Sequence, residues 1–216
     1  TVRSVLVPLA LHAALIGRDL FGAGVMRFGF GQALSVMLWL AVAIYWLESL
    51  FLRLDSLQAF VLPVAAVCVM LPALFHGFEV RDLSASLGFR IHLAMAMAAY
   101  SLFTIAALQA LFMAVLERRL HTSVLIGPFA HLPPLLTLER TLFRLIGIGF
   151  LLLTATIVSG GLFAEQMFGR ALRFDHKTLF AIVSWLIFAA LLVGRYRYGW
   201  RGRSALKWVF AGFVML

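Results

Sequence analysis

Long apolar stretches alternate with short polar links over the whole of the chain. Seven stretches stand out: Val2–Gly17, Phe30–Phe51, Ala59–His76, Ile91–Leu116, Thr141–Phe163, Thr178–Val193 and Ala205–Leu216. A helix needs about 20 mainly apolar residues to cross the hydrocarbon of a bilayer, where no water satisfies a free backbone amide. The pattern therefore predicts an all-α fold, a polytopic transmembrane helical bundle of about seven spans.

The two outermost stretches are shorter than a full span, and we expect both to be truncated in this sequence. The links between the stretches are short, with one exception between the fourth and the fifth. The chain contains neither an internal repeat nor a low-complexity segment. A single transmembrane domain over residues 1–216 is therefore sufficient to account for the pattern.

The exceptional link is Glu117–Arg140, in which Gly127-Pro128 and Pro133-Pro134 indicate turns. The segment Leu135–Arg144 that follows is apolar on one side and has arginines four residues apart on the other. Such a segment forms either an interfacial helix that leads into the fifth span or the early start of that span. The sequence leaves both interpretations open.

Composition places the chain in the membrane class without reference to individual stretches. Hydrophobic residues make up 63% of the 216 positions and charged residues only 12%, and the mean hydropathy is +1.02. Charged residues are about a quarter of an ordinary soluble chain. A soluble domain is therefore excluded, and the lipid bilayer is the first predicted partner.

The formal net charge of +9 comes from Lys and Arg that cluster in the links between apolar stretches. Membrane orientation produces this clustering, so we expect no nucleic-acid partner. Alternate links lie on opposite sides of the membrane, and eleven of the Lys and Arg residues fall on one side and seven on the other. The side with more cations is predicted to be cytoplasmic, because cytoplasmic loops are enriched in Lys and Arg. The cluster from Arg195 to Lys207 belongs to the richer side, and so does the N-terminus. We therefore predict a multi-pass protein of a bacterial inner membrane with a cytoplasmic N-terminus.

The same topology sorts the six histidines by depth. His76, His92 and His176 stand at span ends on the predicted outer side, where neutral imidazoles can ligate a metal or haem. Histidines at span ends also tolerate the interface with no further role. His12 lies near mid-membrane, so it is either functional or hydrogen-bonded to a neighbouring helix. His121 and His131 belong to the cytoplasmic link.

Motifs of soluble enzymes do not occur in the sequence. It has no phosphate-binding glycine loop, no Cys-x-x-Cys pair and no His-Glu-x-x-His helix. Ser159-Gly160-Gly161 in the fifth stretch is better explained by close helix packing than by a nucleophile. The sequence therefore predicts a protein that is not an enzyme.

In the second half of the chain, Arg90-Ile91-His92-Leu93 is followed by Tyr100-Ser101. These residues resemble the outer histidine motif of the cytochrome c assembly superfamily of CcsA- and CcmC-type membrane proteins. Asp175-His176-Lys177 with Trp185 resembles the segment after the family's tryptophan-rich signature. The stretch from Pro133 through Leu162 is similar to the YpjD/HemX-like branch. The resemblance covers residues 90–216, whereas residues 1–80 agree mainly in hydropathy and in the place of His12.

The resemblance implies haem as a possible cofactor, held by histidines on the outer side. His92 matches the family's first outer ligand, and His12 resembles an intramembrane ligand of the larger synthetases. The chain departs from the family before Asp175, where the tryptophan-rich signature is missing, and at His176, where the family has proline. Val193 takes the position of the second intramembrane histidine, so two of four ligands are unaccounted for.

The prediction from sequence is therefore a haem-binding inner-membrane protein associated with cytochrome c assembly. His92 is its expected cofactor-binding residue and iron ligand, with His12 or His176 as the second, and no other metal site is expected. The alternative is a regulatory or scaffold protein that does not bind haem. Such a protein would act through its basic cytoplasmic links on tetrapyrrole synthesis or on another partner.

Overall fold

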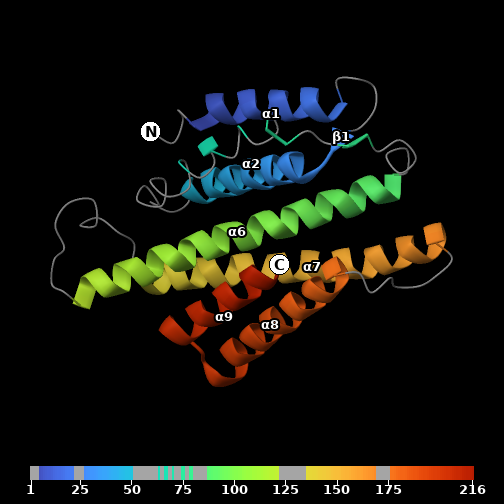
Figure 1. The fold of residues 1–216 in the computed structure, drawn as a ribbon. Helices are drawn as coiled ribbons and strands as arrows, with labels where there is room; N and C mark the ends of the chain where they lie inside the picture. Colours follow the sequence, from blue (N-terminus) through green and yellow to red (C-terminus); the bar gives the residue numbers. More distant parts are fainter. Residues whose placement is uncertain are drawn as a thin grey trace. The chain divides into compact units, whose positions relative to one another are not determined.

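The structure is a computed structural model that describes five continuous segments, residues 5–21, 27–50, 87–121, 135–168 and 176–216, and positions 63, 66, 67, 70, 74, 75, 78 and 79. Its elements are α1 (Leu6–Phe21), β1 (Arg27–Phe28), α2 (Phe30–Ser49), β2 (Phe78–Glu79), α6 (Leu87–His121), α7 (Leu135–Phe168), α8 (His176–Tyr198) and α9 (Gly202–Met215) (Figure 1). The two strands form one antiparallel pair of two residues each. The prediction of a helical membrane bundle is confirmed.

Four described helices are long and apolar enough to cross a membrane: Phe30–Ser49, Leu87–Arg118, Leu135–Leu162 and His176–Tyr198. The first and last helices, α1 and α9, have 16 and 14 residues and are shorter than a span. Most of the third predicted stretch, 59–76, lies outside the described residues. The total of seven spans therefore stays a prediction.

The segment after the long link is part of α7, which runs without a break from Leu135 to Phe168. Of the two interpretations of this segment, the early start of the fifth span is therefore correct. With 34 residues, α7 is about 50 Å long, against about 30 Å of hydrocarbon and 40–45 Å with headgroups. The extra turns at its start carry Glu139 and Arg140, which places charged side chains beyond the hydrocarbon.

The chain divides into two compact units, residues 1–91 and 92–216. In the first unit, α1 lies beside α2, and two hydrogen bonds join them (Figure 1). The Nε2 of His12 lies 2.8 Å from the Oγ of Ser35, and the indole of Trp39 donates to the carbonyl of Leu9 over 2.8 Å. In the membrane such bonds hold helices together where lipid offers no competing partner. The prediction of a single domain stays a prediction.

In the second unit, Phe103 of α6 stacks on Phe188 of α8 with ring centroids 4.0 Å apart, and both are buried. Glycines bring the neighbouring helices close to this stack. A Cβ at Gly149 of α7 would lie 3.2 Å from the Phe103 ring, and one at Gly212 of α9 would lie 2.7 Å from the Phe188 ring. The hydroxyl of Ser184 also donates to the Gly212 carbonyl over 2.8 Å. The aromatic stack is therefore the centre at which four helices meet.

A tight turn joins α8 to α9, which form a hairpin (Figure 1). Gly199 and Gly202 have φ of +65° and +56°, a left-handed conformation that residues with a Cβ rarely adopt. The indole of Trp200 between them covers Gly194, where a Cβ would lie 2.3 Å away, and stacks on Trp208 at 5.3 Å. The turn is therefore fixed by packing as well as by backbone geometry.

Candidate functional site

The candidate site is built around His92, which lies five residues into α6 and is half-buried. Its Nδ1 lies 2.8 Å from the Oγ of Ser159 on α7. The same hydroxyl donates to the carbonyl of Thr156 over 3.1 Å. A hydroxyl has one hydrogen, so when Ser159 donates it to the Thr156 carbonyl, its Oγ accepts from Nδ1–H of His92. The inferred tautomer carries its lone pair on Nε2, which is the form that ligates a metal.

Gly160 lets the imidazole of His92 lie directly against α7. A Cβ at this position would come within 3.3 Å of the Cε1 of His92. The interpretation of Ser159-Gly160-Gly161 as a packing motif is therefore right for Gly160, whereas the pairing of Ser159 with His92 was missed. A signal for it existed, because His92 near the start of one span and Ser159 near the end of the next lie at the same end of an antiparallel pair.

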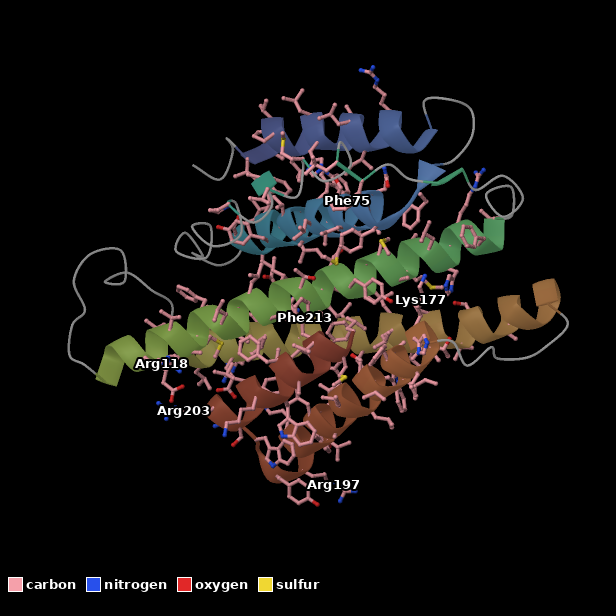
Figure 2. The ribbon with its side chains drawn as sticks, viewed as in Figure 1. Phe75, Arg118, Lys177, Arg197, Arg203 and Phe213 are labelled. Atoms are coloured by element: carbon pink, nitrogen blue, oxygen red, sulfur yellow. The ribbon has the colours of Figure 1, made fainter. Side chains whose placement is uncertain are left out.

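His176 is exposed at the first position of α8, whose start is marked by Lys177 in Figure 2. The stack of Phe103 on Phe188 places α6 and α8 level with one another. His92 and His176 precede the two rings by 11 and 12 residues, or about 17 Å along each helix. Both helices leave the stack in the same direction, because α7 is antiparallel to each. His92 and His176 therefore lie at nearly the same depth in the second unit.

The alternative prediction for His12, a hydrogen bond to a neighbouring helix, is what the structure shows through Ser35. Ser35 is buried, so its hydroxyl would otherwise stand unpaired in an apolar environment. His12 belongs to the first unit, and His92 to the second. His76 and His131 lie outside the described residues, as does the side chain of His121.

Trp185 of α8 also contacts α7, at a position deeper in the second unit than the His92–Ser159 pair. Its indole donates to the Oγ1 of Thr154 over 2.8 Å and stacks on Phe150 with centroids 5.3 Å apart. Thr154 precedes Ser159 by five residues. Polar side chains of α7 therefore bond to both neighbouring helices, Ser159 to α6 and Thr154 to α8. No group of three or more His, Cys, Asp or Glu gathers anywhere in the described part of the chain. The site therefore offers single imidazoles rather than a metal cluster.

Comparison with known proteins identifies the family. Residues 27–216 match the sequence profile of the cytochrome c assembly protein family. The chain belongs to this family. The resemblance seen in the residues from 90 onward is therefore confirmed and extends to residue 27. The matched range includes α2, α6, α7, α8 and α9, and with them His92 and Ser159.

Two kinds of relative define the chain's place within the family. It is 29% identical to the inner membrane protein YpjD of Escherichia coli K12 over 209 residues, which are 96% of this chain and 77% of the relative. It is 40% identical to the cytochrome c biogenesis protein CcsA of Nostoc punctiforme over 80 residues, 37% of this chain and 23% of the relative. The CcsA of Gloeothece citriformis gives 39% over 80 residues, 24% of its length. No solved structure matches the chain.

Proposed function

We propose that this protein handles haem for cytochrome c assembly, with His92 as the protein's ligand to the haem iron. Membership of the cytochrome c assembly family supports a role in the assembly of these cytochromes, and the name of the CcsA relatives, cytochrome c biogenesis protein, agrees with it. The name of the YpjD relative supports a place in the bacterial inner membrane. The role is one of binding and passing on a cofactor, without a catalysed reaction.

The observation that carries this proposal is the hydrogen bond between His92 and Ser159. Metal-ligating histidines generally use one ring nitrogen for the metal and the other for a partner that fixes the tautomer and the orientation of the ring. Ser159 engages Nδ1 in this way, so an iron would be ligated through Nε2. Gly160, on the same turn of α7, leaves room for the ring in this orientation.

His176 is the better of the two proposed second ligands. It lies at nearly the same depth as His92 and is exposed, so its ring has freedom to turn toward a bound group. His12 has its Nε2 engaged by Ser35, and this bond accounts for a histidine within the apolar α1. Bound haem would supply the iron for ligation, and the chain's own histidines would hold it near one membrane end.

The excess of cations at the opposite end of the second unit supports the proposed topology. Arg118 ends one span and Arg197 lies in the last turn of another, and cytoplasmic ends of spans are enriched in such residues. With this end in the cytoplasm, His92 faces the outer side, and the three spans predicted before α6 would put the N-terminus in the cytoplasm as well. Labelling of a cysteine introduced at Lys177 by a membrane-impermeant thiol reagent in intact cells tests this orientation. Failure of the label to react before lysis would reverse the assignment.

The visible spectrum of the purified protein with added haem tests the proposal itself. We expect a Soret band with the wild-type protein and its loss with His92→Ala. Ser159→Ala keeps the ligand but removes its support, so we expect haem affinity to fall by about 10- to 100-fold. Ser35→Ala is the matched control, because it removes a serine that bonds to the other candidate histidine and should leave the band unchanged. A spectrum that His92→Ala does not alter would reject His92 as the ligand.

A further inference from the structure

One end of the second unit collects cations from four helices, α6, α7, α8 and α9. The carboxylate of Glu139 on α7 pairs with Arg195 on α8 and lies 3.8 Å from Arg201 in the turn. Glu117 on α6 lies 3.3 Å from Arg203 on α9. These ion pairs bring together the end of α6, the start of α7 and the α8–α9 turn. We define the basic end by its described cations, Arg118, Arg140, Arg144, Arg195, Arg197, Arg201, Arg203 and Lys207.

The positive charge at the basic end greatly exceeds what its own acids can balance. In the described part of the chain, Glu117 and Glu139 pair with three of its eight cations, Arg195, Arg201 and Arg203. Arg203 and Lys207 lie four residues apart on α9, and Arg118 follows the glutamate that Arg203 contacts. Figure 2 shows Arg118 and Arg203 at the same end of the unit. The basic end therefore carries an excess of positive charge that favours an anionic ligand.

The cations lie at the depth of lipid headgroups. Arg118 is the last residue of one membrane span, and the last turns of another contain Arg195 and Arg197. Tyr196 and Tyr198, beside these arginines, are 90% and 76% exposed. Exposed tyrosines at span ends lie at headgroup level, where the ring contacts chains and the hydroxyl contacts water. Lipid headgroups are therefore within reach of this surface.

The arrangement of these cations is fixed in advance. Trp200 covers Gly194 and stacks on Trp208, and the Arg195 guanidinium donates to the Trp200 carbonyl over 3.1 Å. These contacts hold the start of α9, which carries Arg203 and Lys207, against α8. A preformed array of cations binds with less loss of conformational entropy than a flexible basic loop. Guanidinium groups in addition form paired hydrogen bonds with phosphate oxygens.

We propose that the basic end binds the phosphate headgroup of an anionic phospholipid through Arg118, Arg203 and Lys207. The site is distinct from the His92 site, which lies at the opposite end of the same helices. It assigns a ligand to the surface that faces the cytoplasm in the proposed topology. The phosphate of the bound lipid would offset part of the positive charge that Glu117 and Glu139 leave unbalanced.

Competition between two brominated lipids tests this site, because bromine quenches the fluorescence of nearby tryptophans and Trp208 is adjacent to Lys207. The full chain is placed in phosphatidylcholine vesicles that contain either brominated phosphatidylglycerol or brominated phosphatidylcholine. We expect stronger quenching by the glycerol lipid, which weakens as salt is added. Lys207→Gln should lower the relative affinity about fivefold, and Arg203→Gln with Lys207→Gln roughly 25-fold.

Two matched variants separate lipid binding from other effects. Glu117→Gln breaks the ion pair with Arg203 but adds positive charge, so it should preserve or strengthen the preference for phosphatidylglycerol. Lys177→Gln removes a cation at the opposite end and should change nothing. Lys207 makes no ion pair within the described residues, so Lys207→Gln gives a test that does not depend on lost internal contacts.

Four results would overturn the proposal. Equal quenching by the two lipids, or a double variant that keeps the wild-type preference, would show that these cations do not select an anionic lipid. Displacement of the lipid by inorganic phosphate, beyond that by chloride of equal ionic strength, would identify a site for free phosphate. Equal quenching combined with loss of a co-purifying protein from the double variant would assign the surface to a protein partner. None of these results depends on whether haem binds.

Discussion

Substitution of Gly212 by alanine is expected to loosen the four-helix centre of the second unit. The new Cβ would lie 2.7, 2.9 and 3.0 Å from three atoms of the Phe188 ring, where ordinary contact begins at about 3.4 Å. The ring cannot withdraw, because Phe103 stacks on its other side at 4.0 Å and Gly149 of α7 in turn limits Phe103. Overpacking of this kind costs about 1–3 kcal/mol. We expect a loss of stability within that range for Gly212→Ala.

Gly147→Ala provides the matched control within a helix of the same unit. A Cβ at Gly147 would meet no atom within 4 Å, so the substitution should be neutral or slightly stabilising through helix propensity. The measurement is the free energy of unfolding by SDS in mixed detergent micelles, followed by far-UV circular dichroism. A Phe188→Leu background should reduce the cost of Gly212→Ala, because the two changes share one contact.

Equal stability of Gly212→Ala and Gly147→Ala would refute this reasoning. So would a cost of Gly212→Ala that Phe188→Leu leaves unchanged, since the penalty would then arise elsewhere than at the ring. The comparison also distinguishes packing from a general intolerance of alanine in these helices. The test therefore addresses the aromatic stack itself, which places His92 and His176 at nearly the same depth.

Two further predictions concern polar contacts between helices. Glu139→Gln should destabilise the protein by about 2 kcal/mol, below the 3–5 kcal/mol of a fully buried pair because Glu139 and Arg195 keep 12% and 20% exposure. Glu117→Gln, at a more exposed pair, should cost less than about 1 kcal/mol in the same unfolding assay, and equal costs would contradict the argument from burial. Ser35→Ala should cost about 0.5–1.5 kcal/mol by leaving His12 without its partner, whereas Ser49→Ala, which loses only a bond within α2, should cost less. A larger loss with Ser49→Ala would show that the α1–α2 bond contributes little.

Much of the helical arrangement follows from the sequence because hydrophobicity in the membrane determines which segments become helices. The ends of the helices are less predictable, since α6 and α7 continue as helices into the headgroup region beyond their apolar stretches. Hydrophobicity does not predict helix in these charged segments, and it does not predict that Arg195 pairs with Glu139. Gln109 is a comparable case, because its buried amide donates to the Leu138 carbonyl over 2.8 Å and so joins α6 to α7.

The candidate site was predictable in its residues and less so in its contacts. His92 stands out in sequence through its place at a span end and through its motif. Its pairing with Ser159 depends on the rotation of two helices about their axes, which periodicity does not determine when both helices are apolar on most sides. The hydrogen bond of His12 to Ser35 was foreseen as one of two alternatives, but its partner residue was not.

Chemical rescue of the ligand is the most direct test of the proposed function. In His92→Gly the imidazole is removed and a space of matching shape remains beside Ser159 and Gly160. The account predicts that the purified variant with haem lacks the Soret band of the wild-type protein, and that added imidazole restores it. Restoration should weaken in His92→Gly with Ser159→Ala, where the support for the ring is gone. A wild-type protein that gives no Soret band with haem, or a His92→Gly variant that keeps the full band before imidazole is added, would contradict the account.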